Sequence, residues 1–250
     1  MGPINMSPTG SLLAPTSRCT DCSLRNNGIC CELADEHLHE LSSIMSHRHF
    51  TAGSEIIHQD DTSELFAIVM TGTIKLTRML EDGRQQIVGL LSTTDCLGSL
   101  YSGTSHDSAE CVTDVTLCSF PCKKFEAVLE AHPELQHRLL LRTMKDLDDA
   151  REWVLALGQK NAGEKSAMFL VWLVDKQQWQ HSNRSDPGAP LVLQIPFTRH
   201  EIGNFLGLTL ETVSRQFSKL KRAGVIGLPG AKLIEIKDVD ALRCLAVQDA

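Results

Sequence analysis

Cysteine is the residue type with the most potential for chemistry in this chain, and four of its cysteines lie close together near the N-terminus. Cys19 and Cys22 form a C-x2-C pair, and Cys30 and Cys31 follow after a stretch that contains Asn-Asn-Gly. Two thiolates separated by two residues can reach one metal centre from a single turn, and the flexible stretch allows a third to swing back. Zinc and iron–sulfur centres both accept four thiolates. The spacing therefore predicts three ligands, with Cys30 or Cys31 as the third, and a fourth from elsewhere.

The fourth ligand must be one of the distant cysteines, and spacing alone does not choose among them. The candidates are Cys96, Cys111, Cys118, Cys122 and Cys244. Because cysteine is among the most buried residue types, most of these five are expected to be small core side chains. The odd total of nine cysteines, without a secretory signal, argues against a disulfide framework.

The ten histidines include two pairs with i, i+2 spacing, His37 with His39 and His47 with His49. On a helix such pairs face apart, and neither pair has a third ligand nearby in the sequence. Solvated or half-buried imidazoles are therefore expected rather than a second metal site.

Length and composition bound what these residues can belong to. The chain has 250 residues, 42% of them hydrophobic, and a formal charge of −7, so any DNA-binding surface has to be local. The longest apolar run, 168–174, is far short of a membrane span, which predicts a soluble protein. Residues 1–17 are rich in Pro, Ser, Thr and Gly, without a signal peptide, and are expected to form a disordered arm of a cytoplasmic protein.

The middle of the chain, from about 50 to 120, is a series of short strand-like runs broken by turn residues. Asp82-Gly83 is a strong hairpin signal. Closely spaced short strands of this kind indicate an antiparallel jelly roll, a scaffold that serves sensors as often as enzymes. The chain has no nucleophile elbow, phosphate loop or paired-carboxylate context, so we do not expect an enzyme.

Helical periodicity follows the β-rich region, with a short helix over 123–131 and a long one from 134 to about 160. The long helix has a heptad-like apolar stripe consisting of Leu140, Met144, Leu147, Val154 and Leu157. A second apolar face carries Leu139, Leu141, Trp153 and Leu155. One face can pack on its own domain while the stripe contacts a second subunit, which predicts a parallel homodimer.

Residues 195–222 carry the strongest motif in the sequence, that of a helix-turn-helix. A first helix is expected after Thr198, a turn at Gly207, and a second helix capped by Thr209. Gly203 leaves room for the close approach of the second helix. The buried face of that helix is expected to consist of Val213, Phe217 and Leu220, and a hairpin over 228–236 completes a winged helix.

The positive charge of the protein is concentrated in this motif. From 198 to 222 there are five basic and two acidic residues, in a chain of net charge −7. In the major groove, Arg can donate two hydrogen bonds to guanine, and Glu can accept one from cytosine. Contacts to phosphate set affinity rather than sequence, and we expect them from Thr198, Arg199, Thr209, Thr212, Lys219, Lys221 and Arg222.

The predicted jelly roll, the long helix with its apolar stripe and the winged helix together resemble the Crp/Fnr superfamily over nearly the whole chain. This superfamily contains the cyclic-AMP receptors and the fumarate–nitrate-reduction regulators. The cyclic-AMP receptors carry Arg-Ser-Ala in their phosphate-binding cassette, whereas the matching stretch here is Asp107-Ser108-Ala109. An acid at that point predicts no cyclic-nucleotide binding. The N-terminal cysteines and the sequence Glu-Thr-Val-Ser-Arg over 211–215 are similar to the oxygen-sensing Fnr group.

The resemblance implies a 4Fe-4S cluster held by Cys19, Cys22, Cys30 and Cys118. It favours Cys118 because Cys-Ser-Phe-Pro at 118–121 fits the family's distal-cysteine context. It further implies that Glu211, Ser214 and Arg215 read bases at palindromic TTGAT-N4-ATCAA-like sites. In oxygen, the cluster would be lost and the DNA released. The resemblance also implies a contact between the 80–85 loop and RNA polymerase. A regulator of the same superfamily that uses the cysteines as a zinc site or thiol switch is the main alternative, and a purely structural dimer module is a weaker one.

These expectations define a domain plan for an α+β protein. It consists of a disordered arm over 1–17, a cluster-binding antiparallel β jelly-roll sensor domain over 18–132, a dimerisation helix over 133–160 and a winged helix-turn-helix DNA-binding domain over 161–250. Double-stranded promoter DNA, RNA polymerase and a second copy of the chain are the expected partners, and no membrane is.

Overall fold

The computed structural model describes residues 11–13, 19, 22, 24–25, 28–31, 33–62, 64–101, 103–180, 191–230 and 232–247, without the side chains of 11–13 and 177–180. The chain divides into two compact units, one over 1–147 and the other over 148–250. In the described residues, no helix is both long and apolar enough to cross a membrane.

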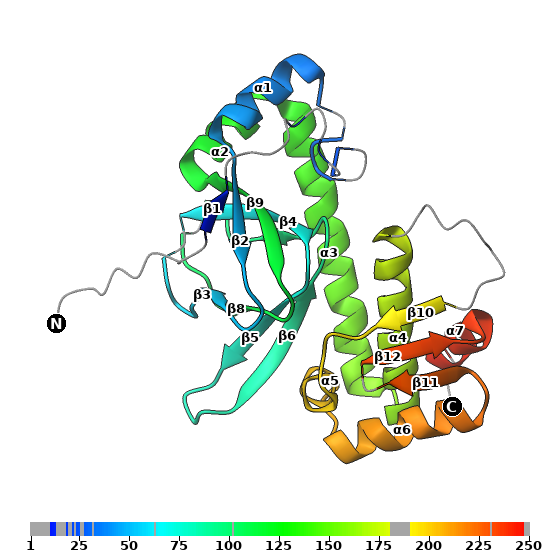
Figure 1. Ribbon diagram of the computed structural model, residues 1–250. Coiled ribbons are helices and arrows are strands. Elements are labelled where there is room, and N and C mark those ends of the chain that lie inside the picture. The colour runs from blue at the N-terminus through cyan, green and yellow to red at the C-terminus, as the bar shows by residue number, and fades with distance from the viewer. Residues whose placement is uncertain are drawn as a thin grey trace. The chain divides into compact units, whose positions relative to one another are not determined.

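The first unit consists of two antiparallel sheets, as the predicted jelly roll requires (Figure 1). The five-stranded sheet has the order β1-β2-β9-β4-β7, and the four-stranded sheet has the order β3-β8-β5-β6. The strands are β1 (Ser11–Leu13), β2 (Ser46–Phe50), β3 (Glu55–Ile57), β4 (Leu65–Thr71), β5 (Ile74–Met79), β6 (Gln85–Leu91), β7 (Cys96–Leu97), β8 (Ser108–Cys111) and β9 (Val115–Pro121). The Asp82-Gly83 signal is confirmed, because β5 and β6 pair on either side of it and Gly83 has φ +83°.

Two hydrophobic cores lie on opposite faces of β9, because side chains alternate along a strand. Val115 and Leu117 belong to the core that also contains Ile74 and Ala109 of the other sheet. Cys118 and Phe120 belong to a second core, which the helices and the N-terminal cysteine segment cover. The central strand β4 serves both cores, and four consecutive residues, 66–69, are buried.

The prediction of a fully disordered arm over 1–17 is wrong for residues 11–13. They form β1, which pairs antiparallel with β2. The edge of a sheet offers unpaired backbone N–H and C=O groups to any extended segment, whatever its side chains, so composition did not reveal this pairing. The rest of that segment lies outside the described residues.

Three helices accompany the sheets. They are α1 (Asp35–Ile44), α2 (Cys122–Ala131) and the 27-residue α3 (Pro133–Gln159). Proline is well tolerated at the first position of a helix, where no intrahelical N–H bond is lost, and Pro133 begins α3 in this way. The predicted short and long helices are thus confirmed to within a residue or two.

The second unit contains the predicted winged helix and one strand that the sequence did not reveal. Its elements are α4 (Ala162–Gln180), β10 (Leu191–Gln194), α5 (Arg199–Leu206), α6 (Leu210–Arg222), β11 (Ile226–Gly230), β12 (Leu233–Ile236) and α7 (Val239–Val247). The predicted hairpin is β11 with β12, and β10 extends it to a three-stranded sheet of order β10-β12-β11. The fold class, an α+β protein with a β-roll domain and a winged helix, is confirmed.

Candidate cluster site and nucleic-acid interface

The described residues of the N-terminal cysteine segment form turns that pack against the core containing Cys118. Arg25 N–H donates to the Cys22 carbonyl at 2.9 Å, and Gly28 N–H donates to the Leu24 carbonyl at 2.7 Å. The buried side chains of Leu24 and Ile29 hold the segment on the core, and Cys19, Cys22 and Cys30 pack partly buried against it.

Arg25 is a structural residue of this segment that the sequence did not suggest. Its guanidinium donates to the carbonyls of Cys30 at 2.6 Å, Cys31 at 2.8 Å and Leu33 at 2.7 Å. It also pairs with Asp35 at the start of α1, at 3.2 Å. One side chain therefore fixes the path of the chain after the C-x2-C pair and places a positive charge beside the thiols.

The four cysteines that the resemblance selects are neighbours in the structure. Burial raises the pKa of the Cys118 thiol, and the next causes are the charges of Cys30, Cys19 and Cys22. Burial, followed by the charges of Cys19 and Cys22, likewise raises the pKa of Cys30 to about 12.

The other cysteines have different surroundings. Cys31 accepts a hydrogen bond from the Arg138 guanidinium at 2.8 Å, and Cys122 donates to the Ser99 carbonyl at 3.8 Å. Cys111 lies in the core between the two sheets, and Cys244 is exposed in the second unit. Cys96 differs from these four because it packs against the same core as the selected cysteines, and its charge is one of the causes that raise the pKa of Cys30.

The spacing of these thiols bears on what they can hold. Within the described residues, no three cysteine Sγ atoms lie within 4.8 Å of one another. Four thiolates on a single tetrahedral zinc ion at about 2.3 Å would lie roughly 3.8 Å apart. A 4Fe-4S cluster takes one thiolate at each of four irons, so its ligands lie further apart than those of a single zinc ion.

The histidine predictions need two corrections. His47 and His49 lie on strand β2 rather than on a helix, so they share a face, and His47 is directly opposite Cys118 in the β2–β9 ladder. Burial lowers the pKa of His47. His37, which the sequence left without a third ligand, lies beside His132 and Glu134.

The first half of α3 packs on the β-roll near the core that contains Cys118, which we call the cysteine core. Leu139 packs against that core, and the Arg142 guanidinium forms an ion pair with Asp95, a residue that is 4% exposed. Arg142 also donates to Asp146 at 2.9 Å. The second half of α3 packs within the second unit, where Trp153 meets Phe205 edge-on with ring centroids 4.7 Å apart.

The predicted seam of α3 is exposed along its whole length. Its five members are 37–72% exposed: Leu140, Met144, Leu147, Val154 and Leu157. Leu141 and Leu155, which the sequence assigned to the other apolar face, are exposed as well, so only Leu139 and Trp153 of that face pack within their own units. The exposed apolar surface of α3 is therefore wider than the predicted stripe.

The helix-turn-helix has the local geometry that its residues predict. Thr198 and Glu201 form a capping box at the start of α5, and Gly207 ends that helix in the left-handed conformation. A Cβ on Gly203 would lie 2.6 Å from the Leu208 carbonyl oxygen, so only glycine permits this turn. Thr209 caps α6 by accepting a hydrogen bond from the Thr212 N–H at 3.2 Å.

The residues predicted to read bases lie in the first turns of α6. Glu211 and Arg215 are exposed and Ser214 is half-buried. The pKa of Glu211 lies below its usual range because its own backbone N–H and then the Thr209 hydroxyl donate to the carboxylate, so it is an acceptor at neutral pH. Arg215 donates to the Thr212 hydroxyl at 3.2 Å.

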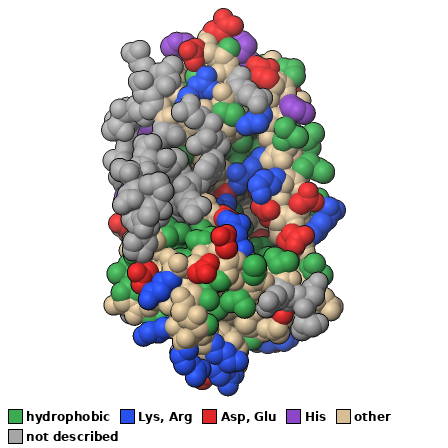
Figure 2. Space-filling model, turned by 90° about the vertical axis from the view of Figure 1, so that its right-hand side faces the viewer, with side chains coloured by type: hydrophobic (Ala, Val, Ile, Leu, Met, Phe, Trp, Pro, Cys, Tyr) green, Lys and Arg blue, Asp and Glu red, His purple; other side chains and the backbone are tan. Residues whose placement is uncertain are grey.

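The residues predicted to contact the DNA backbone surround that surface, with one difference. Thr198, Thr209, Lys219, Lys221 and Arg222 are exposed, and Thr212 is half-buried. Arg199 is half-buried too, and its guanidinium carbon lies 4.0 Å from the centroid of the Phe217 ring. Lys and Arg side chains gather at the lower end of the space-filling view, where α6 lies in Figure 1 (Figure 2).

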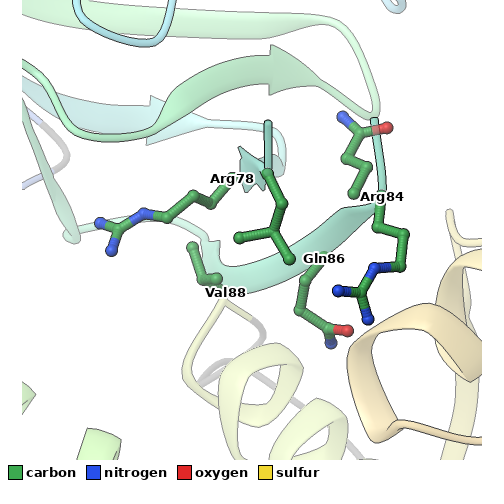
Figure 3. Close-up of a pocket in the computed structure, with 6 residues that line it drawn as sticks. Arg78, Arg84, Gln86 and Val88 are labelled. Atoms are coloured by element: carbon green, nitrogen blue, oxygen red, sulfur yellow. The ribbon is translucent and has the colours of Figure 1, made fainter. Parts of the chain in front are cut away.

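The β5–β6 hairpin, which contains the predicted polymerase-contacting loop, carries a surface pocket of about 450 Å³ (Figure 3). It is lined by Arg78, Leu80, Arg84, Gln85, Gln86 and Val88. Leu80 and Val88 are 50% and 45% exposed, so apolar and basic groups lie side by side at the hairpin.

Comparison with known proteins identifies both units. Residues 47–132 match the family model of the cyclic nucleotide-binding domain, and residues 164–245 match that of the Crp-like helix-turn-helix domain. The chain is 39% identical to the transcriptional activator protein FnrL of Cereibacter sphaeroides, over 88% of each chain. It is 33% identical to the nitrogen fixation regulation protein FixK of Bradyrhizobium diazoefficiens, over 95% of this chain and 99% of the relative.

A solved structure agrees with these sequence matches. That of FixK2 from Bradyrhizobium japonicum superimposes with a TM-score of 0.71 at 30% identity, covering 83% of this chain and all of the other. The relatives are transcriptional regulators and not enzymes. The β-roll, the recognition helix with its basic surroundings and these likenesses together establish that the chain belongs to the Crp/Fnr family of DNA-binding transcriptional regulators.

Proposed function

We propose that this regulator responds to oxygen, and that Cys19, Cys22, Cys30 and Cys118 hold a 4Fe-4S cluster when oxygen is absent. The observation that carries the proposal is the position of Cys118, which belongs to the buried core against which Cys19, Cys22 and Cys30 pack. In the loaded state the chain forms a homodimer along α3 and binds DNA, and in oxygen it loses the cluster and releases DNA.

Two groups beside the thiols, Arg25 and Ser42, favour the anionic form against the effect of burial. The Arg25 charge lowers the pKa of Cys19 and of Cys30, which partly offsets the cost of burying thiolates. Ser42 donates a further hydrogen bond to Cys19. When bound, such a cluster would supply an iron–sulfide core that oxygen can oxidise, and its iron–thiolate bonds would link the N-terminal segment to β9.

The side chains of α3 supply a route from this core to the dimer. Leu139 contacts the cysteine core from the same helix that carries Leu140 and Met144 on its exposed face. Tightening the core through the four cysteines favours one position of this helix, and the exposed stripe is then presented in register with that of a second subunit. Ion pairs between Arg142 and Asp146 and between Arg151 and Asp148 partly neutralise the acidic side chains beside the stripe.

DNA reading follows from the exposed polar face of α6. We infer that Arg215 donates two hydrogen bonds to guanine, that Glu211 accepts from cytosine, and that Ser214 contacts a base edge. A two-fold dimer places two such helices on one face of the duplex, which fits palindromic TTGAT-N4-ATCAA-like sites.

Two further partner assignments belong to this proposal. The exposed β5–β6 hairpin, with Leu80 beside Arg84, is a suitable contact for RNA polymerase. Cyclic nucleotides are not expected to bind, because Asp107 is paired with Arg78 at 2.8 Å and the Ser108 hydroxyl already accepts a hydrogen bond from the Gln59 N–H at 2.9 Å. An acidic group at this position repels a phosphate.

Iron and acid-labile sulfide analysis of anaerobically purified protein tests the cluster. We expect about four of each per chain in the wild type, and a large loss in Cys118→Ala. Cys111→Ala removes an equally buried cysteine from the other core and serves as the matched control, which should retain the full content. A wild type without iron, or equal iron in Cys118→Ala and Cys111→Ala, would contradict the proposal.

The same samples separate the alternative readings. Zinc-loaded protein is colourless, whereas an iron–sulfur centre absorbs visible light. A colourless, iron-free wild type that still binds DNA under reducing conditions, and loses it on oxidation, would favour the thiol switch.

A further inference from the structure

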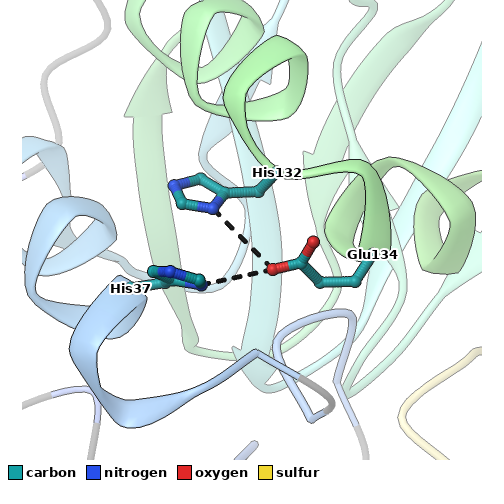
Figure 4. Close-up of side chains that lie close together, drawn as sticks. All are labelled: His37, His132 and Glu134. Carbon is teal, nitrogen blue, oxygen red and sulfur yellow. Dashed lines mark hydrogen bonds and ion pairs between the residues drawn. The ribbon is translucent and has the colours of Figure 1, made fainter.

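A second group of potential metal ligands lies where α1 meets the junction of α2 and α3. It consists of His37 of α1, His132 between α2 and α3, and Glu134 in the first turn of α3 (Figure 4). One donor atom from each residue lies within 4.8 Å of the other two. Among the described residues, this is the one set of three His, Cys, Asp or Glu side chains that meets this criterion.

The two imidazoles point ring nitrogens at the same carboxylate oxygen. Nδ1 of His37 lies 3.2 Å and Nδ1 of His132 lies 3.7 Å from Oε1 of Glu134. Ligands of a tetrahedral zinc ion with bond lengths of about 2.0–2.1 Å lie roughly 3.3 Å apart. The two separations from Glu134, 3.2 and 3.7 Å, lie on either side of that value.

The outer nitrogens of both rings face carboxylates, as they do around bound metals. Nε2 of His132 lies 2.8 Å from Oε2 of Glu40, within hydrogen-bonding distance. With the proton on Nε2, the lone pair of His132 is on Nδ1 and directed at the common point. Nε2 of His37 lies 3.8 Å from Oε1 of Glu36, which provides a weaker version of the same arrangement.

The setting is accessible to an ion. The side chains of His37 and Glu134 are 36% and 38% exposed, whereas that of His132 is 10% exposed. A partly open set of three ligands leaves a fourth position for water.

We propose that His37, His132 and Glu134 form a binding site for a divalent first-row transition metal, of which zinc is the representative. Two imidazole nitrogens and one carboxylate oxygen suit zinc, nickel or copper better than magnesium or calcium, which prefer all-oxygen ligands. The site is separate from the four cysteines and does not depend on the proposed cluster.

The position of the site gives it a structural consequence. It joins α1, which directly follows the cysteine segment, to the first turn of the seam helix α3. A bound ion would replace one hydrogen bond and one longer ion-pair contact by three coordinate bonds, and would hold the two helices together more firmly. Because an ion that binds only the folded form stabilises it, the melting temperature of the first unit should rise with zinc concentration.

Equilibrium dialysis of the full chain tests the site, with bound zinc measured by atomic emission under anaerobic, reducing conditions. The cysteines can bind zinc as well, so the informative quantity is the difference between matched variants. His37→Ala should bind one zinc ion fewer per chain than the wild type. His39→Ala removes an exposed imidazole from the same helix and should bind as much as the wild type.

Two further measurements keep the test independent of folding defects. Glu40→Gln leaves all three ligands in place and should weaken the binding of zinc by about 10-fold, the lower end of the effect expected for an outer hydrogen-bond partner. Long-range proton–nitrogen NMR of the wild type should show that zinc shifts the ring nitrogens of His37 and His132 and leaves those of His39 and His137 in place. Equal zinc in His37→Ala and the wild type, or ring nitrogens of His37 and His132 that do not respond to zinc, would overturn the proposal.

Discussion

Removal of the Arg142 guanidinium should destabilise the first unit by far more than removal of a comparable charge elsewhere on α3. Asp95 is 4% exposed, and Arg142 is its ionic partner. Breaking a buried ion pair by deleting one member typically costs 3–5 kcal/mol, because the other charge stays buried without compensation. Asp95 keeps hydrogen bonds from the N–H of Ser92 at 2.8 Å and from its hydroxyl at 3.3 Å. We therefore expect about 3 kcal/mol for Arg142→Ala, the lower end of that range.

The same helix provides a control. Arg151 and Asp148 form an ion pair at 3.1 Å with both side chains 67% exposed. Exposed pairs of this kind contribute roughly 0–1 kcal/mol, so Arg151→Ala should change the free energy of unfolding by less than 1 kcal/mol. The double variant Asp95→Asn with Arg142→Met removes both charges and should recover much of the lost stability.

The choice of assay follows from where the tryptophans lie. All three tryptophans are at or beyond position 153, in the second unit, so their fluorescence does not report on the first. Amide hydrogen exchange of β4 and β9 measures the stability of the first unit directly. A loss of about 3 kcal/mol corresponds to roughly 100-fold faster exchange of the most protected amides in Arg142→Ala. Little or no acceleration in Arg142→Ala would refute the argument from burial.

Three other predictions concern recognition, assembly and thiol reactivity. Arg215→Ala should relax the sequence preference at one base pair of the half-site, with a loss of about 1–3 kcal/mol of binding free energy. Lys221→Ala should instead weaken binding to all DNA sequences alike. Salt titrations should then show that the slope of the logarithm of the binding constant against the logarithm of the salt concentration falls by about one. Val154→Glu places a charge on the exposed stripe at a position that is 72% exposed, and sedimentation should detect a weaker dimer with unchanged monomer stability. Burial raises the pKa of Cys111 to about 12. Because only the thiolate is alkylated, iodoacetamide at pH 8 should modify Cys111 far more slowly than the exposed Cys244. The rate at Cys111 should rise as the pH approaches 12. Equal rates at the two cysteines would show that the core around Cys111 opens readily.

The parts of the fold that were predictable depend on signals contained within a few residues. Thr198 and Gly207 mark the ends of α5 because a capping box and a left-handed turn need only their immediate neighbours. The Asp-Gly hairpin and the ends of α2 and α3 are of the same kind. Strand β10 was missed because its four residues are an ordinary apolar run, and its pairing with β12 connects positions about 40 residues apart.

The sites divide along the same line. The spacing of the C-x2-C pair alone indicates two candidate ligands, whereas the choice of Cys118 as the fourth ligand required a family resemblance. The contact between His37 and Glu134 joins residues 97 positions apart, so no local pattern could suggest it. The position of Arg142 against Asp95 is likewise a product of packing between α3 and a loop of the β-roll. The sequence identified the residue types that do chemistry, and the folded chain determines which of them meet.

The alternation of β9 between two cores has a consequence for when the protein could acquire the proposed cluster. Cys118 is held by a strand that pairs with both β2 and β4, while Cys30 lies roughly 90 residues earlier, so bringing the two together closes a long loop. A chain still emerging from the ribosome offers three thiols without the fourth until β9 has been synthesised and paired. Loading with iron should therefore follow folding of the β-roll rather than guide it, and a nascent chain that ends before β9 should be unable to retain the metal.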